Sequence, residues 1–586
     1  MKKLITLFLL FTIFIQPGFA RTDDDILQAM RDEISRSLGQ LKIESLDKPY
    51  YIEYKLIIRR SHIVKALYGS LTESRDIPSA QLNVGVRVGD YKFDNSNFFD
   101  FGLSFFGGGD QEESFKHRKI PIELDYNALR RELWLATDAA YKQVAETFTK
   151  KQTTLKSRLR KDTTHDFLKV KPDKHYYKEH YPDFDTPYFE NLTKELSSIF
   201  TKYSQIDISS VGVEYLPATI YYVNSEGMEY IKNDFYTGLE IVAATQAEDG
   251  MPLANYYTAF SRSPKSLPAK DSLLTATRNV AELLAKLKNA PTLDDAYSGP
   301  IIFDRVAASQ IFAQVFVPNL TTQRSQLTES GIQDNERFTA FQNKIGGRVL
   351  PEFFDVNDKP ALKYFGGTEL MGNYLIDDEG VKSENVLLVK KGYLKGLLSS
   401  RVPTKRVRKS NGHQRGGAPM FSNITISSDK KHSRTYTQLK KQLLKLVKDR
   451  ELPYGIVVRK LIDQNIMFTT LFRLTKGLAV GGQIRRSLPA VEVYRIYPDG
   501  HEELVRGCEA KGFTHQSFKD IINAGKTNYV LNYLAPAVTS PFMSGGSQYV
   551  MASVISTSLL FEDGEIKSVE QDFPKPPLLP SPVTLK

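Results

Sequence analysis

The chain has 586 residues, of which 41% are hydrophobic and 25% charged, and this composition is ordinary for a globular protein. Its length predicts two or more domains. A single cysteine, Cys508, excludes an internal disulfide and any zinc site built from several thiolates. The formal net charge of +10 is mild for this length, so charge alone does not indicate a nucleic-acid-binding protein.

The first twenty residues have the pattern of a secretory signal peptide. Lys2 and Lys3 give a positive start, residues 4–15 are apolar, and residues 18–20 are Gly-Phe-Ala before the expected cut. The apolar run is shorter than the roughly 20 residues that a membrane-spanning helix needs, although an uncleaved anchor is the alternative. Arg21 follows where a lipoprotein would have cysteine. We therefore expect an exported, soluble protein of the periplasm or the cell surface.

Helical and strand patterns alternate in the first part of the chain. Carboxylates at 23–25 start a helix whose apolar residues share one face as far as Leu38. Between Pro49 and Phe99, polar and apolar residues alternate, which predicts antiparallel strands. Apolar residues from Leu129 to Phe148 are spaced for a long helix with one buried stripe.

A domain boundary is expected near the middle of the chain. The polar stretch 150–186 is rich in Lys, His and Pro and is predicted to be an exposed connection. Helices around 189–203 and 276–287 flank further strands, and Ala290-Pro291 ends the second helix. We therefore assign residues 21–290 to an N-terminal α/β domain.

The remainder of the chain is rich in strand patterns. We assign residues 291–570 to a β-rich C-terminal domain with one helix near 437–450. Residues 491–497 and the Pro-Asp-Gly turn at 498–500 predict a hairpin. Five prolines after Phe573 predict an extended, solvated tail at 571–586.

Short segments along the chain match one known family in their order and spacing. The most specific is Gly372–Gly380, which contains an Asp-Asp-Glu-Gly turn and precedes a glycine-turned hairpin at 392–396. Asn224–Gly227 is similar to a turn late in that family's N-terminal domain, and 297–303 is similar to the entry strand of its C-terminal domain. Short segments within residues 41–150 are similar to the N-terminal region of exported members of that family. These segments resemble the TldD/PmbA family of metallopeptidase-related proteins.

The resemblance implies a fold and a class of ligand. The fold is α+β with two domains, a mixed N-terminal α/β domain and a β-rich C-terminal domain. Family members handle unstructured peptides or protein segments, and they pair as homodimers or as heterodimers with a related chain. We expect the same partners here and no nucleic acid.

The family's zinc motif is degenerate in this sequence. Catalytic members carry His-Glu-x-x-x-His on the helix after the entry strand, and a later cysteine completes the site. By spacing, Ala313 and Pro318 stand at the two histidine positions and Gln314 at the glutamate. Alanine and proline offer no ligand atom, and glutamine is a poor general base. The region 535–547, where the later cysteine is expected, holds none. We therefore expect no catalytic residues, no zinc and no other cofactor.

The most concentrated charge in the second half is basic. Within fifteen residues stand Arg401, Lys405, Arg406, Arg408, Lys409, His413 and Arg415. Such a loop can hold phosphate or an acidic partner. No aromatic residue interrupts it before Gly417, which argues against nucleic acid. The preferred interpretation is a solvated loop without a ligand, and contact with an anionic envelope surface or partner is the alternative.

Other candidate sites favour structural interpretations. His501 begins a zincin-like sequence but stands in the predicted hairpin turn, so we interpret it as solvated. His175 and His180 are five residues apart and are predicted to lie in an exposed loop. Cys508 has no adjacent histidine to activate it, so we expect an inert, buried thiol.

The leading hypothesis is a non-catalytic or partner-type peptidase homologue that grips unstructured peptides as an added strand. Two alternatives stay open: an active metallopeptidase that uses non-standard ligands such as His413, His432 and His515, and a structural envelope protein. The apolar residues of 304–317 cover more than one helical face, so this helix is predicted to be buried on most sides.

Overall fold

The computed structural model describes most of the chain from residue 22 onward. The described residues are 22–44, 46–99, 119–156, 163–322, 324–328, 331–333, 340–462, 487–537, 549–569, 572, 573, 577 and 579. The predicted signal peptide at 1–20 and nearly all of the predicted tail lie outside them. None of the helices within these ranges combines the length and the hydropathy needed to cross a bilayer.

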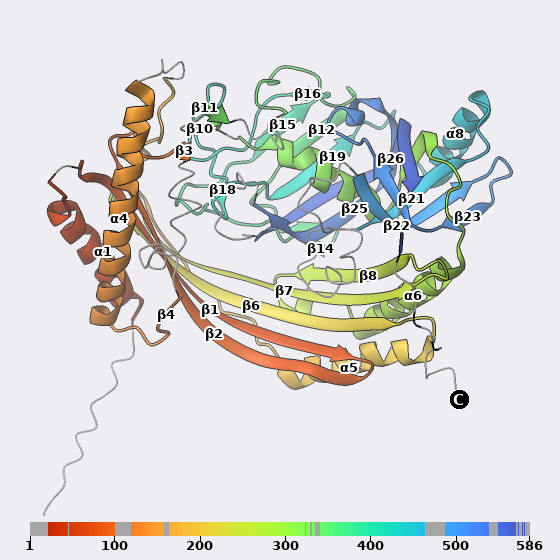
Figure 1. Ribbon diagram of the computed structural model, residues 1–586, viewed down its shortest axis with the longest axis horizontal. Coiled ribbons are helices and arrows are strands. Elements are labelled where there is room, and N and C mark those ends of the chain that lie inside the picture. Colours follow the sequence, from red (N-terminus) through yellow and green to blue (C-terminus); the bar gives the residue numbers. More distant parts are fainter. Residues whose placement is uncertain are drawn as a thin grey trace, which may run out of the picture.

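One long, curved sheet forms the base of the N-terminal half (Figure 1). Within the described ranges its seven strands follow the order β4, β2, β1, β6, β7 and β5, and β8 pairs with another part of β7. The predicted alternation at 51–56 and 82–88 falls in the antiparallel pair β1 and β2. The strands are β1 (Pro49–Leu67), β2 (Ser70–Val88), β4 (Lys119–Ile120), β5 (Lys174–Tyr177), β6 (Ile208–Asn224), β7 (Glu229–Gln246) and β8 (Pro252–Ser261).

The two faces of this sheet have different partners. Ile52 and Leu56 of β1 pack with α1 and α4, and Val64, farther along the strand, packs with α5 and α6. Because side chains alternate along a strand, odd-numbered β1 residues lie on the opposite face, which Figure 1 shows turned toward the C-terminal domain. We call this the inner face. The helices are α1 (Asp23–Gln40), α4 (Tyr126–Lys156), α5 (Thr186–Ser198) and α6 (Lys270–Asn289).

The C-terminal half is a second, larger sheet of twelve described strands. Since β9 pairs with both β21 and β26, the strands β26, β24, β22, β21 and β9 close into a ring. The mixed helix and strand content with a β-rich C-terminal region confirms the predicted α+β fold class. The main elements are β9 (Tyr297–Phe303), β12 (Phe354–Asp358), β15 (Val386–Lys390), β19 (Asn423–Ser428), α8 (Tyr436–Asp449), β21 (Gly455–Leu461), β22 (Ser487–Ile496), β23 (Glu502–Val505), β24 (Cys508–Lys511), β25 (Ile521–Pro536) and β26 (Tyr549–Ser568).

The helical segment after β9 is a core element, as predicted. It consists of α7 (Val306–Ile311), a π-helical turn at Phe312–Phe316 and a 3₁₀ turn at Val317–Leu320. Phe312 and Phe316 are fully buried, and both rings contact Phe518. The segment therefore stabilises the C-terminal domain through apolar packing.

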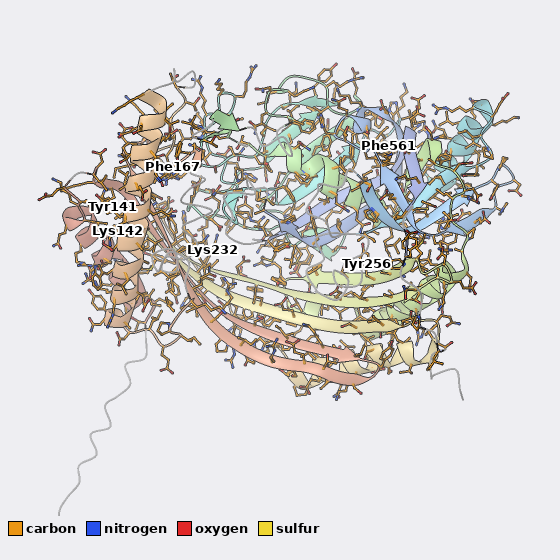
Figure 2. All side chains as sticks on the ribbon, in the orientation of Figure 1. Tyr141, Lys142, Phe167, Lys232, Tyr256 and Phe561 are labelled. Carbon is orange, nitrogen blue, oxygen red and sulfur yellow. The ribbon has the colours of Figure 1, made fainter. Side chains whose placement is uncertain are left out.

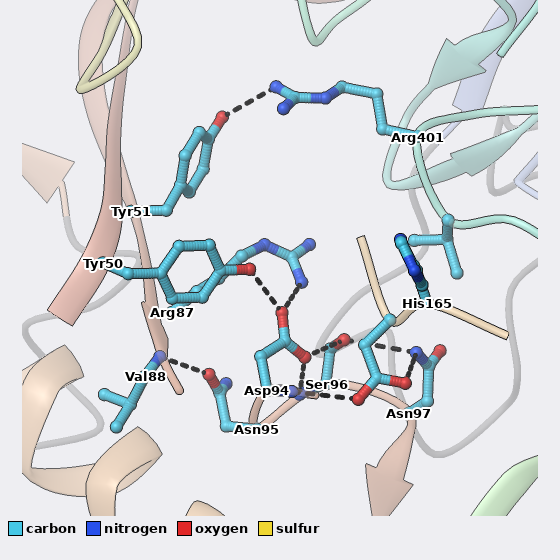
Figure 3. A network of polar contacts seen from close by, with 12 residues as sticks. Tyr50, Tyr51, Arg87, Val88, Asp94, Asn95, Ser96, Asn97, His165 and Arg401 are labelled. Atoms are coloured by element: carbon cyan, nitrogen blue, oxygen red, sulfur yellow. Dashed lines mark hydrogen bonds and ion pairs between the residues drawn. The ribbon is translucent and has the colours of Figure 1, made fainter. Parts of the chain in front are cut away.

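The stretch 150–186 is only partly the exposed connection that its polar composition predicted. α4 continues to Lys156, and the β5 strand, which contains His175, pairs in parallel with β7. Lys151 is buried, and its ammonium donates to the Asp166 carboxylate at 2.7 Å and to the carbonyl oxygens of Asp94 and Ser96. Figure 3 shows the surrounding network, in which the Asp94 carboxylate also accepts from Tyr50 and Arg87. Complete pairing lets a charged residue lie inside the fold, and composition alone does not reveal such pairing.

Candidate functional site

The three residues at the degenerate zinc positions are part of the protein packing. Ala313 and Pro318 are buried. The Gln314 side-chain amide donates to the carbonyl oxygen of Ile462 at 3.3 Å, just after β21. One turn earlier, Gln310 donates to the Tyr256 hydroxyl at 2.7 Å and accepts from the Leu461 amide at 2.9 Å. The polar side chains of this helix thus join it to β21 and β8, and Ala313 and Pro318 supply no ligand atom for zinc.

The alternative histidine ligands lie in separate surroundings. His413 is buried 3.7 Å from Asp358, His432 bonds to Asp429, and the His515 ring stands edge-on to Phe341. Among the described residues, no three His, Cys, Asp or Glu side chains are grouped so that they could hold a metal ion. The expectation that the protein binds no zinc stays a prediction, because part of the chain lies outside the described ranges.

The structural interpretations of His501 and Cys508 are confirmed. His501 is exposed in the turn between β22 and β23, where its ring nitrogen bonds to Asp499. Cys508 is buried, and burial raises the pKa of its thiol to about 12. A thiol with such a high pKa is a weak nucleophile at neutral pH.

The Asp-Asp-Glu-Gly turn lies against the N-terminal sheet. Asp377 organises the turn, because its carboxylate accepts from the amides of Glu379 and Val381, both at 2.9 Å. Gly380 has a φ of +78°, and a Cβ there would stand 2.6 Å from the Met228 side chain. Glycine is therefore required both for the backbone conformation and for the close contact between the two domains.

Asp378 makes an ionic link between the domains. Its carboxylate pairs with Lys55 of β1 at 2.9 Å and with Lys232 of β7 at 3.2 Å. Burial alone would raise the pKa of Asp378, but these two ammonium groups lower it well below its ordinary value. Figure 2 shows Lys232 on the sheet, near the end that carries α4.

Arg401 forms the centre of a buried polar group that we call the junction cluster: Tyr51, Glu53, Tyr222, Glu226, Glu379 and Arg401. The side chain of Arg401 is 0% exposed and pairs with Glu226 at 2.8 Å. It also donates to the Leu168 carbonyl oxygen at 2.7 and 2.9 Å, and its guanidinium lies 4.0 Å from the centre of the Phe167 ring. Figure 3 shows Arg401 reaching from the C-terminal domain to the Tyr51 hydroxyl.

Two acids at this junction, Glu379 and Asp377, have raised pKa values. The hydroxyls of Tyr51 and Tyr222 donate to the Glu53 carboxylate at 2.8 and 2.6 Å. Burial, together with the neighbouring Asp377, raises the pKa of Glu379 to about 8. Burial likewise raises the pKa of Asp377 to about 6. Glu379 is therefore mostly protonated at neutral pH.

The predicted basic loop is smaller than its sequence implied. Arg401 lies in the junction cluster, and Arg415 is buried with hydrogen bonds to the carbonyl oxygens of Phe421 and Met551. The sequence placed both arginines in an anion-binding or solvated loop, whereas the structure buries them against protein partners. The residues that remain exposed are Lys405, Arg406, Arg408 and Lys409. A contact between these four and an anionic partner stays a prediction.

Sequence patterns did not reveal the outer edge of β8, which lies beside the C-terminal domain and pairs with no further described strand. The outer side of β8 is marked by the carbonyl oxygens of Tyr256 and Phe260, which accept from Lys460 at 3.1 Å and from Asn532 at 3.4 Å. Every second residue of a strand directs its backbone N–H and C=O to the same side. Thr258, two residues from each of these, therefore also directs its backbone groups outward. Among the described residues, neither its N–H nor its C=O has a partner. Figure 2 places Tyr256 on this strand, beneath the C-terminal domain.

Comparisons with known proteins agree with this architecture. Residues 296–490 match the family model described as the PmbA/TldA metallopeptidase C-terminal domain. A search of curated proteins by sequence finds no match. The match covers 195 of the 586 residues, and over this part the chain resembles that domain.

Solved structures extend the likeness to nearly the whole chain. A candidate modulator of DNA gyrase from Thermotoga maritima has a TM-score of 0.55 at 13% identity, covering 92% of this chain and 99% of that one. TldE from Thermococcus kodakarensis gives 0.55 at 13%, covering 92% and 100%. A candidate modulator of DNA gyrase from Bacteroides thetaiotaomicron gives 0.57 at 12%, covering 94% and 100%. At these identities the likeness establishes the fold alone.

Proposed function

We propose that this chain is a non-catalytic, partner-type member of the TldD/PmbA family that binds unstructured peptides without cleaving them. The observation that carries the proposal is the fate of the zinc positions. Ala313 and Pro318 have no donor atom, and the amide of Gln314 bonds to a backbone carbonyl. Hydrolysis by a bound metal needs ligands and a base, and this helix provides neither.

Peptide binding is supported by the outer edge of β8, which pairs with no further described strand. An extended segment can add to a sheet edge through main-chain hydrogen bonds, which read no particular sequence. The outward N–H and C=O of Thr258 form one such donor and acceptor pair. The Tyr256 and Phe260 carbonyl oxygens on either side accept hydrogen bonds from the C-terminal domain. A peptide at Thr258 would therefore lie between the two domains.

Location and assembly belong to the same proposal. The pattern of residues 1–20 supports export to the periplasm or the cell surface. A chain that binds peptides without cleaving them needs a second chain to process or receive them. The family resemblance supports a homodimer, or a heterodimer in which a related chain would carry the catalytic site.

The test is peptide cleavage by the purified mature protein and by Gln314→Ala, each with and without added zinc. We expect no cleavage in any of the four samples, and elemental analysis should find no stoichiometric zinc. Zinc-stimulated cleavage by the wild type that disappears in Gln314→Ala would overturn the proposal, because it would return the chemistry to this helix.

A further inference from the structure

A buried carboxyl group on the inner face lacks the partners that buried charges normally have. Glu240 of β7 is 3% exposed, and its Oε1 atom has no hydrogen-bond partner. Burial raises the pKa of this carboxyl well above its ordinary value, and Lys65 only partly opposes the shift. Burying a polar group without a hydrogen bond is costly, so such a group calls for an explanation.

Glu240 lies in a row of residues that crosses four strands. Lys65 of β1 pairs with Gly212 of β6, Gly212 pairs with Glu240 of β7, and Glu240 pairs with Thr258 of β8. Cross-strand partners point to the same face, so the side chains in this row lie on the inner face. Gly212 has no side chain, and Thr258 has a short, uncharged one. Glu240 is therefore the acidic residue of this row between Lys65 and the sheet edge.

The cation nearest to Glu240 already has a partner. The Lys65 ammonium pairs with Glu73 of β2 at 2.9 Å. A second carboxyl, Glu214, stands diagonally from Glu240, because Glu214 pairs with Gly238 two residues away along β7. Glu214 accepts from Ser61 at 3.3 Å and from Tyr236 at 3.2 Å. The row therefore contains more acidic than basic groups around Glu240.

The outer edge of β8 is the next position in this row. A peptide strand added there would place one residue opposite Thr258, and a side chain on the inner face would point toward Glu240. Neighbouring strands are about 4.8 Å apart, so the added strand would stand roughly 10 Å from β7. The long side chain of lysine or arginine can extend past Thr258 over this distance and direct its charged end toward Glu240.

We propose that Glu240, supported by Glu214, forms a subsite for a basic side chain, lysine or arginine, of a peptide strand added at the β8 edge. The inference deepens the proposed function, on which it rests, by naming the class of peptide that the chain selects. Binding the cation would favour the ionised form of Glu240, whose proton leaves to solvent, and would supply its missing partner. The charged and titratable groups that face this position are Lys65, Glu73, Glu214 and Tyr236.

The test compares two fluorescently labelled, otherwise uncharged extended peptides in which the central residue is lysine or its uncharged analogue norleucine. Fluorescence anisotropy with the full-length mature protein should show about tenfold tighter binding of the lysine peptide, as a desolvated ion pair provides. Glu240→Gln should bring the ratio of the two affinities close to one. Asp234→Asn, an acid on the same strand and face but distant from the row, should keep the wild-type ratio.

Each outcome bears on a separate part of the inference. Equal binding of both peptides by the wild type, or an unchanged ratio in Glu240→Gln, overturns the basic subsite and leaves peptide binding intact. Failure of the wild type to bind either peptide overturns both the subsite and the proposed function. If Glu240→Gln does not fold, Glu214→Gln provides the second measurement, and a reduced ratio there supports the subsite.

Discussion

The helix after β9 and the Asp377–Gly380 turn belong to the same domain, yet they bury their residues in different ways. The helix buries rings and small side chains, and its two glutamines bond to Tyr256 and to the backbone at 461–462. The turn buries acids, and one of them, Asp378, pairs with two lysines of the N-terminal sheet. Packing and hydrogen bonds stabilise this helix, and its residues need no catalytic role. The charges at the turn are stabilised only while both domains are joined.

The largest expected effect comes from breaking the junction cluster. Arg401→Met removes the cation that faces Glu226 and lies beside Glu379. The uncompensated buried acid should lower the free energy of unfolding by on the order of 5 kcal/mol. Urea denaturation measures the loss. Arg406→Met in the exposed loop is the matched control and should change stability by less than about 0.5 kcal/mol; equal effects of the two variants would contradict a buried role for Arg401.

Apolar packing of the degenerate helix predicts the next largest effect. Phe312 is fully buried and contacts Phe316 and Phe518, so Phe312→Ala should destabilise the protein by about 3 to 5 kcal/mol. Val315→Ala, at a half-buried position of the same turn, should cost clearly less. Thermal unfolding of the two variants distinguishes them, and a Phe312→Ala protein as stable as the wild type would exclude a core role for the helix.

The acids at the turn predict a dependence of stability on pH. Below its ordinary pKa of 4.5, Glu379 is neutral in both the folded and the unfolded state. Between pH 4.5 and about 8 the unfolded chain releases the proton and the folded chain keeps it, so folding stability falls as pH rises.

Glu379→Gln removes this titration. Relative to the wild type, the variant should gain stability on the order of a few kcal/mol between pH 5 and pH 8. Chemical denaturation at the two pH values measures the difference. Parallel pH profiles for the two proteins would mean that Glu379 is already ionised in the folded state.

The smallest expected change in stability concerns the β8 edge. Thr258→Pro removes an N–H that points away from the sheet, so it should cost little stability at an edge strand. Peptide affinity should fall by about tenfold, because one main-chain hydrogen bond and the fit of the added strand are lost. Thr258→Val keeps the N–H and should bind peptide like the wild type. If both variants bind equally, the peptide does not pair with β8.

Local patterns predicted the fold class and the burial of the helix at 304–317, because periodicity reports which faces of an element are apolar. They placed Arg401 wrongly, since its partners Glu226 and Leu168 lie more than a hundred residues away. The row that contains Glu240 was invisible for a related reason. It depends on the pairing register of four strands, and a register shift of one residue would move Glu240 to the other face.

The most direct test is whether the mature protein holds a peptide intact without metal. A labelled extended peptide is incubated with the protein in the presence and in the absence of a zinc chelator, its binding is measured by anisotropy, and the recovered peptide is weighed by mass spectrometry. We expect the same affinity in both samples and full-length peptide in each. Loss of binding with the chelator, or peptide fragments that form only without it, would contradict a non-catalytic, zinc-independent peptide-binding protein.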